Sequence, residues 1–288
     1  MKRVFFLFLV IYVASCTERI DIKTDNAPSR IAIYGHISSD PMPHSIRITH
    51  SAGYFSDDSP EGVSNAIVTI SDDDGNVIPL AENADTQGLY ETSPDVYGEE
   101  GKTYTLDVLL ETGEHYRASA HLQTINIDID SIGLQVSRIS NTFVETLLYA
   151  HDTERKNYYS FFVAINDSVV NPTIDDFLVR NDVLLDGRGV ACYFLNQEPD
   201  HEYRNEKLNI GDKVTLNINA IPKEYATFIS NVQSELRGSM PIFGGPPANV
   251  PTNIVSLNDA TPALGFFSAF PSRYAHTTVK EDFSIKNK

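Results

Sequence analysis

The chain has 288 residues, a formal net charge of −17 at pH 7 and two cysteines. A chain this acidic repels phosphate backbones, which argues against nucleic acid as a partner. The length is enough for two domains, and a hydrophobic content of 41% can supply a core without help from disulfides.

The first residues have the layout of a secretory signal. Lys2 and Arg3 precede a short apolar run, and the run ends in small residues before Cys16. The segment Val13-Ala14-Ser15-Cys16 resembles a bacterial lipobox, in which the cysteine is diacylated after cleavage. We therefore expect residues 1–15 to be a signal peptide and Cys16 to carry lipid. The alternatives are a plain signal peptide or a membrane helix with a chance cysteine, although the run is shorter than the roughly 20 residues that span a bilayer.

Residues 16–28 are polar and without sustained periodicity, so we expect a lipidated tether. Surface-exported lipoproteins of Bacteroidetes-type bacteria often carry an acidic cluster after the cysteine, and Glu18 and Asp21 form a weak version of one. The expected location is the outer membrane, facing the cell surface, with the periplasmic face as the alternative. A lipidated Cys16 leaves Cys192 without a partner for an intramolecular disulfide.

Residues 29–123 predict a first domain that is an antiparallel β-sandwich. Short runs of alternating apolar and polar residues are separated by turns rich in Gly, Asp and Pro, which is typical of sandwich strands. Pro79 marks its run as an edge strand or a strand end. The predicted strands are 31–37, 46–49, 65–71, 77–80, 88–90, 102–110 and 114–122.

Residues 124–288 predict a second antiparallel domain, either a barrel or a larger sandwich, so the expected fold class is all-β. One amphipathic helix is expected near 222–237, because apolar residues recur at i, i+3, i+4, i+7 and i+11 from Tyr225 to Leu236. An apolar strand at 264–270 follows, and we expect 273–280 to pair beside it. The remaining predicted strands are 125–132, 143–150, 158–166, 177–185, 190–195 and 213–220.

Two clusters invite a metal interpretation, and both have a simpler explanation. The run 72–76, Asp-Asp-Asp-Gly-Asn, resembles half of a calcium loop, but Asp-Gly between two strands is a strong hairpin signal and is preferred. His36, His44 and His50 match no zinc spacing, and strand parity turns His36 away from Ile33. We expect a turn, surface histidines, no metal and no cofactor.

No catalytic motif is present for nucleophilic chemistry, phosphate binding or dinucleotide binding. Cys192 lies in an apolar strand, where a cysteine is usually a small buried hydrophobe. Asp128 and Asp130 share one face of a strand, which a solvated edge explains as well as a carboxylate pair does. We therefore expect a protein that is not an enzyme.

The most unusual stretch is rich in glycine and proline and runs from 243 to 253. Two glycines permit unusual backbone angles and three prolines stiffen the rest, which suits recognition of a partner or ligand. The alternative is a structural lid over the open end of the sheet, with Phe243 as its plug. The candidate interface residues are Phe243, Gly244, Gly245, Pro246, Pro247, Asn249 and Asn253.

Part of the first domain resembles the carboxypeptidase-regulatory-like sandwich. The resemblance rests on a strand at 63–70, an Asp-Gly turn at 74–75, Gly88-Leu89-Tyr90, and the Gly-x-x-Tyr-x-Leu pattern at 101–106. It implies a fold and carries no catalytic residue.

The chain also resembles the Bacteroidetes lipoproteins called domain of unknown function 4249. The matching features are the lipobox, the first domain, 129–132, Gly211-Asp212-Lys213-Val214, the late helix, and the segments 243–253 and 264–269. The resemblance implies an accessory lipoprotein that works with a TonB-dependent transporter in nutrient capture, and it implies no ligand. The alternatives are a structural or adhesive surface protein and a hydrolase with an unrecognised site.

Overall fold

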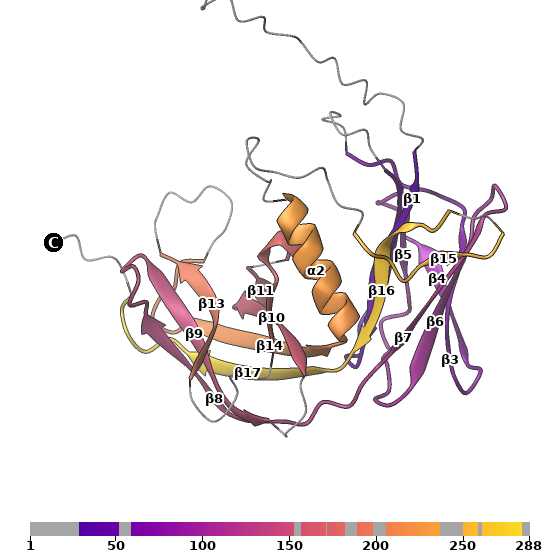
Figure 1. Cartoon of the computed structure of the whole chain (residues 1–288). Helices are drawn as coiled ribbons and strands as arrows, with labels where there is room; N and C mark the ends of the chain where they lie inside the picture. The colour runs from indigo at the N-terminus through magenta and orange to yellow at the C-terminus, as the bar shows by residue number, and fades with distance from the viewer. Residues whose placement is uncertain are drawn as a thin grey trace, which may run out of the picture.

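The computed structural model describes residues 29–51, 59–152, 157–170, 172–181, 189–197, 206–236, 250–258 and 261–283. Within these ranges the chain forms three β-sheets of nine, five and three strands, with one α-helix and one short 3₁₀-helix. The expected all-β class is confirmed. Figure 1 shows the nine-stranded sheet on one side, the two smaller sheets on the other, and the α-helix between them.

The nine-stranded sheet is built mostly from the first half of the chain. Its strands alternate between buried and exposed positions, so Ile33, Ile46 and Leu106 enter one continuous apolar core. The sheet order is β15-β7-β6-β3-β4-β5-β2-β1-β16. The strands are β1 (Ile31–Ser38), β2 (Ser45–His50), β3 (Ile67–Asp72), β4 (Val77–Glu82), β5 (Leu89–Glu91), β6 (Thr103–Leu109), β7 (His115–His121), β15 (Val255–Ser256) and β16 (Leu264–Phe270).

The turn between β3 and β4 confirms the predicted hairpin. The Asp72 N–H donates to the Asn76 carbonyl at 3.0 Å, and Gly75 takes a φ of 87° that favours glycine. The Asp72 carboxylate accepts hydrogen bonds from Asn76 and pairs with Lys102 at 3.2 Å. This carboxylate therefore serves the turn.

Strand β16 does not lie where the sequence predicted. It pairs in parallel with β1, whereas the other pairings among the described strands are antiparallel, and 272–278 pairs with another sheet rather than with β16. Five successive residues of β16, 266–270, are buried, so the strand needs apolar cover on both faces. Phe267 enters the core of the nine-stranded sheet. Phe266 and Phe270 enter a separate apolar cluster with the helix, which we call the helix cluster. The predicted second domain, 124–288, included this strand, whereas β16 pairs with β1 of the nine-stranded sheet. The domain boundary at 123/124 itself stays a prediction.

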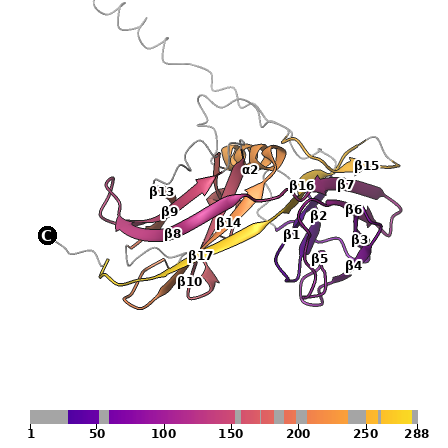
Figure 2. The ribbon, with the colours of Figure 1, turned by 90° about the horizontal axis from the view of Figure 1, so that it is seen from below.

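The two smaller sheets enclose a second apolar core. Phe161, Cys192 and Leu216 all belong to it, so its members come from both sheets. Figure 2 shows these two sheets from below, beside the nine-stranded sheet. The three-stranded sheet contains β8 (Ile127–Val136), β9 (Phe143–Asp152) and β13 (Val190–Asn196); the five-stranded sheet contains β10 (Tyr158–Ile165), β11 (Ser168–Val169), β12 (Leu178–Asn181), β14 (Lys213–Ile221) and β17 (Ser272–Thr278).

The predicted helix is present as α2 (Lys223–Leu236), preceded in sequence by the 3₁₀-helix η1 (Ile174–Asp176). Tyr225, Phe228 and Ile229 are buried, as the apolar stripe predicted. Leu236, the last residue of that stripe, is 60% exposed, so the buried face of the helix ends before it. No helix in the described part of the chain is both long enough and apolar enough to cross a membrane.

Specific polar contacts join the nine-stranded sheet to the part of the molecule that contains the two smaller sheets and α2. We call these two parts the two regions. The Tyr34 and Tyr225 hydroxyl oxygens lie 2.7 Å apart, and the Ser272 N–H donates to the Ser39 hydroxyl at 2.9 Å. Arg273 on β17 forms an ion pair with Glu100 at 2.7 Å. The surfaces that these contacts hold together include the walls of a cavity.

Candidate ligand-binding cleft

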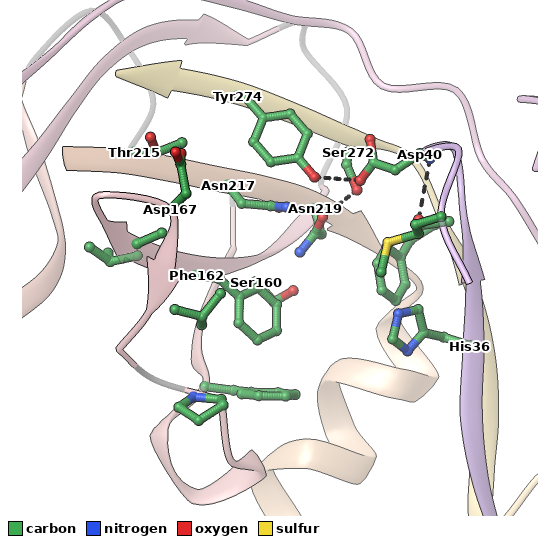
Figure 3. Close-up of a pocket in the computed structure, with 18 of the residues that line it drawn as sticks. His36, Asp40, Ser160, Phe162, Asp167, Thr215, Asn217, Asn219, Ser272 and Tyr274 are labelled. Carbon is green, nitrogen blue, oxygen red and sulfur yellow. Dashed lines mark hydrogen bonds between the residues drawn. The ribbon is translucent and has the colours of Figure 1, made fainter. Parts of the chain in front are cut away.

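A cavity of about 730 Å³ lies between the end of β1 and the five-stranded sheet. Its walls come from β1 and the turn after it, from β10, β14 and β17, and from Tyr225 of α2 and Phe270 of β16. Figure 3 shows these side chains turned toward a common space, which we call the cleft. The cleft therefore depends on both regions of the molecule.

Three neighbouring strands line the cleft with side chains in register. Strand pairing places Ser160, Asn219 and Ser272 side by side across β10, β14 and β17. It places Phe162 beside Asn217, and Asn217 beside Tyr274. The intervening residues Val214, Leu216 and Ile218 point the other way into the apolar core, so the polar face of β14 faces the cleft.

A short hydrogen-bond network fixes the polar wall (Figure 3). The Ser272 hydroxyl donates to Asn219 Oδ1 at 2.7 Å, and the Tyr274 hydroxyl donates to Asp40 Oδ2 at 2.5 Å. Burial, together with the Asp40 carboxylate, raises the pKa of Tyr274. Tyr274 therefore stays protonated and holds Asp40 by donating to it.

Two side-chain oxygens of this wall lack a partner. Thr215 Oγ1 and Asn217 Oδ1 are shielded from solvent and have no hydrogen-bond partner among the described residues. A buried polar atom left unpaired costs about 1–3 kcal/mol, so native proteins contain few of them. Thr215 and Asn217 lie two positions apart on β14, which lines the cavity. We therefore expect this wall to be less stable than an apolar wall of the same shape.

The rest of the cleft lining is apolar and aromatic, and it comes from both sides of the cleft. Phe162 packs edge-to-face on Phe177 with ring centroids 4.5 Å apart, and Phe270 stacks on the His36 ring at 4.8 Å. Met42 adds a flexible apolar side chain. The rings offer flat surfaces on which the body of an organic molecule can pack.

His36 lines the cleft, so the prediction of a surface histidine is wrong at this position. Burial, with a smaller contribution from neighbouring His44, lowers the pKa of His36 to about 4. The ring is therefore neutral at pH 7 and adds no positive charge to the cleft. Parity placed His36 on the correct face of β1, but the pattern of one strand does not tell what covers that face.

His44 is also not a surface residue, since only 1% of it is exposed. Its Nε2 lies 3.1 Å from the Val96 carbonyl, and its Nδ1 lies 3.4 Å from the Ser38 N–H. These partners require a donor at Nε2 and an acceptor at Nδ1, which is the neutral tautomer. Burial lowers its pKa in the same direction. His50 is exposed, as predicted.

The charges of the cleft do not balance. Lys213 and Asp167 form an ion pair at 3.2 Å, and both side chains are largely exposed. Asp40 has no cationic partner among the described residues: its carboxylate accepts from the Tyr274 hydroxyl, and burial lowers the pKa of nearby His44, so that this ring is neutral. With His36 neutral, the cleft carries a net negative charge.

Most of the residues predicted as an interface lie outside the described residues. These are Phe243, Gly244, Gly245, Pro246, Pro247 and Asn249, and the same holds for the lipidation candidate Cys16. Asn253 is described, and its amide donates to the Phe267 carbonyl at 2.7 Å and accepts from the Phe267 N–H at 3.0 Å. The same amide reaches the Ser119 carbonyl at 3.4 Å, so Asn253 bridges β16 to β7. The interface itself stays a prediction.

The other candidate residues lie away from the cleft. Cys192 is buried in the core, as predicted, and burial raises the pKa of its thiol to about 12. Asp128 and Asp130 are exposed, with Asp130 3.1 Å from His151. The cleft residues were not predicted as a site from the sequence, although polar side chains alternate with apolar ones along 213–219.

Fold and site together define an all-β protein in which two strand regions enclose an aromatic cleft with one polar wall. Residues 17–274 match the family described as Domain of unknown function (DUF4249). The chain belongs to this family, as the sequence resemblance predicted.

Other comparisons add little. No curated protein matches the chain. Among solved structures, the crystal structure of a DUF4785 family protein from Legionella pneumophila is similar, with 12% identity and a TM-score of 0.23. The match covers 65% of this chain and 51% of that one, so the chain spans about half the length of that structure.

Proposed function

We propose that this chain is a lipid-anchored outer-membrane binding protein that captures a small molecule in the cleft and works with a TonB-dependent transporter. The observation that carries the proposal is the cleft. Its volume of about 730 Å³ lies within the range of small-molecule sites, and it combines aromatic surfaces with a few converging polar groups. This composition favours ligand capture over a purely structural or adhesive role.

A non-enzymatic role is part of the proposal. The thiol of Cys192 is buried in the core, and its raised pKa keeps it protonated. In the cleft, the Ser272 hydroxyl is already committed to Asn219 and the Tyr274 hydroxyl to Asp40. These bonds fix the wall in one shape, which suits a binding surface.

Filling the cleft tests ligand capture. Ala164 on β10 lines the cleft, so Ala164→Trp should occupy space that a ligand needs. Ala81→Trp is the control, because Ala81 lies exposed on β4 of the other region. Small molecules extracted from each protein after purification from native membranes are compared by mass spectrometry. We expect a compound that is present with the wild type and with Ala81→Trp and absent with Ala164→Trp; identical profiles for all three would contradict the proposal.

The anchor and the partner are tested separately. Cys16→Ala should release the protein from membranes, and a variant that still sediments with the outer membrane after a carbonate wash would disprove the lipid anchor. A co-purified transporter, identified by mass spectrometry from native membranes, would support the accessory role. Its absence under mild cross-linking would favour a binding protein that acts alone.

A further inference from the structure

We infer that the cleft selects a small organic cation, in which an ammonium or guanidinium group on an apolar, aromatic body pairs with Asp40. The inference deepens the proposed function and rests on it. It comes from the charge, hydrogen-bonding and surface chemistry of the described cleft residues.

The head group is defined by Asp40. This carboxylate lines the cleft, is partly buried, and accepts only a neutral hydroxyl, that of Tyr274, among its described contacts. Its backbone N–H donates to the Ser38 hydroxyl at 3.3 Å, which ties the turn to β1. A fixed carboxylate without a cation is a ready partner for a charged donor, since bonds between two ionised groups are the stronger ones.

The other cleft groups disfavour an anion. Lys213 is already paired with Asp167 at the rim, and the His36 ring is neutral at pH 7. Ser272 and Tyr274 use their hydroxyl protons within the protein. A carboxylate or phosphate ligand would meet Asp40 without a free cation to offset the repulsion.

The body of the ligand is defined by the aromatic side chains of the cleft. Phe162 and Phe177 line the cleft, as does Phe270, which is buried and stacked on the His36 ring; aromatic rings attract both apolar groups and cations that approach their faces. The charge of −17 on the whole chain adds a field that attracts cations toward the molecule. Body and head group requirements therefore point to the same class of ligand.

Three probes with one body separate the possibilities. Phenethylamine, 2-phenylethanol and phenylacetate share a phenyl ring and differ in a cationic, neutral or anionic head group. Titration calorimetry with the full chain at pH 7 and low salt should rank them in that order, with the amine at least about tenfold tighter than phenylacetate. Added salt should weaken amine binding more than alcohol binding, because only the amine gains from charge attraction.

Variants locate the effect. Asp40→Asn keeps the acceptor for Tyr274 but removes the charge, so it should reduce the preference for the amine to less than about threefold and leave 2-phenylethanol unchanged. Asp85→Asn makes the same charge change at an exposed position between β4 and β5, which does not line the cleft, and should change nothing. Thermal unfolding of each variant checks that the fold is retained.

The outcomes are distinguishable from failure of the proposed function. Phenylacetate binding as tightly as phenethylamine, or amine selectivity that survives Asp40→Asn, overturns the inference. The lack of binding by any probe at millimolar concentration overturns it as well. If an anion binds and Ala164→Trp blocks it, the cleft is a binding site for another class of ligand, so the proposed function stands while the inference falls.

Discussion

Strands β6 and β14 have the same pattern and opposite surroundings. In β6, Tyr104, Leu106 and Val108 are buried, and the alternate residues face outward. In β14, Val214, Leu216 and Ile218 are buried in the same way. One face of each strand builds a core, so the difference between the two regions lies in what the other face meets.

The outward face of β6 meets solvent and is satisfied by its neighbours. Thr105 Oγ1 lies 3.1 Å from the Ser119 hydroxyl, and Asp107 pairs with Arg117 at 2.8 Å. The corresponding face of β14 meets the cleft, where Thr215 Oγ1 and Asn217 Oδ1 lack partners. Polar residues on an alternating strand therefore do not by themselves indicate a solvated surface, because residues of the same kind line a cavity when a second region covers them.

The largest expected effect is on the rate at which the thiol of Cys192, in the region that contains β14, is alkylated. In a Cys16→Ser chain, Cys192 is the remaining cysteine, so its labelling reports on the region of β14 and not on that of β6. Because Cys192 is buried and its pKa is raised to about 12, the native chain should react with iodoacetamide at least about a thousandfold more slowly than the unfolded chain. Labelling is followed by mass spectrometry at pH 8, with denaturant as the control. Native labelling at the unfolded rate would show that this core opens freely.

A matched pair of core truncations tests whether the two regions unfold together. Leu106→Ala and Leu216→Ala each remove a fully buried side chain, so each should lower the free energy of unfolding by about 2–5 kcal/mol. Since β16 enters both the core of the nine-stranded sheet and the helix cluster, and β14, which carries Leu216, enters the same cluster through Ile221, we expect both variants to shift one common transition in denaturant. Leu109→Ala, at a position 39% exposed, is the control and should cost little. Two separate transitions, each moved by one variant, would contradict the coupling.

The covered histidine should make stability fall with acid. The pKa of His36 is about 4 in the folded chain against about 6.5 unfolded, so the unfolded state takes up the proton first as pH falls. Stability is therefore lost between about pH 6.5 and pH 4, by up to about 3 kcal/mol from this residue. His36→Gln should flatten that part of the profile, measured by denaturant unfolding at several pH values. Part of the slope should remain, because the pKa of His44 is lowered too.

His50→Gln is the control for that experiment, since His50 lies exposed at the end of β2. A profile that is equally steep in His36→Gln and in the wild type would show that His36 is more accessible to water than its contact with Phe270 implies.

Much of the fold was predictable because each strand carries its own signal. Alternation and turn residues predicted most strands of both regions, the hairpin at Gly75 and the helix α2. The position of β16 was not predictable in this way. Its run of buried residues indicates cover on both faces, but the choice of β1 as a parallel neighbour depends on how two regions pack.

The cleft was harder to predict because its residues come from separate parts of the sequence. Asp40, Asn217 and Tyr274 are brought together only by strand pairing and by the turn after β1. The sequence drew attention to 243–253 through its composition, and of that stretch the described Asn253 makes a backbone bridge between β7 and β16. Unusual composition is visible along a chain, whereas convergence of ordinary polar residues is not.

The smallest expected effect tests the comparison of the two strands directly. Thr215→Val replaces a shielded, unpaired hydroxyl with a methyl group of nearly the same shape, so it should raise the free energy of unfolding by about 1 kcal/mol. Thr105→Val makes the same change on β6, where the hydroxyl has a partner in Ser119, and should lower it by about 0.5 kcal/mol. Thermal and denaturant unfolding of the unliganded proteins measure both. Opposite signs would show that the polar wall of the cleft is held at a cost in stability that the solvated face of β6 does not carry; a loss of stability in both variants would mean that the Thr215 hydroxyl is satisfied in solution, and the two faces would then be equivalent.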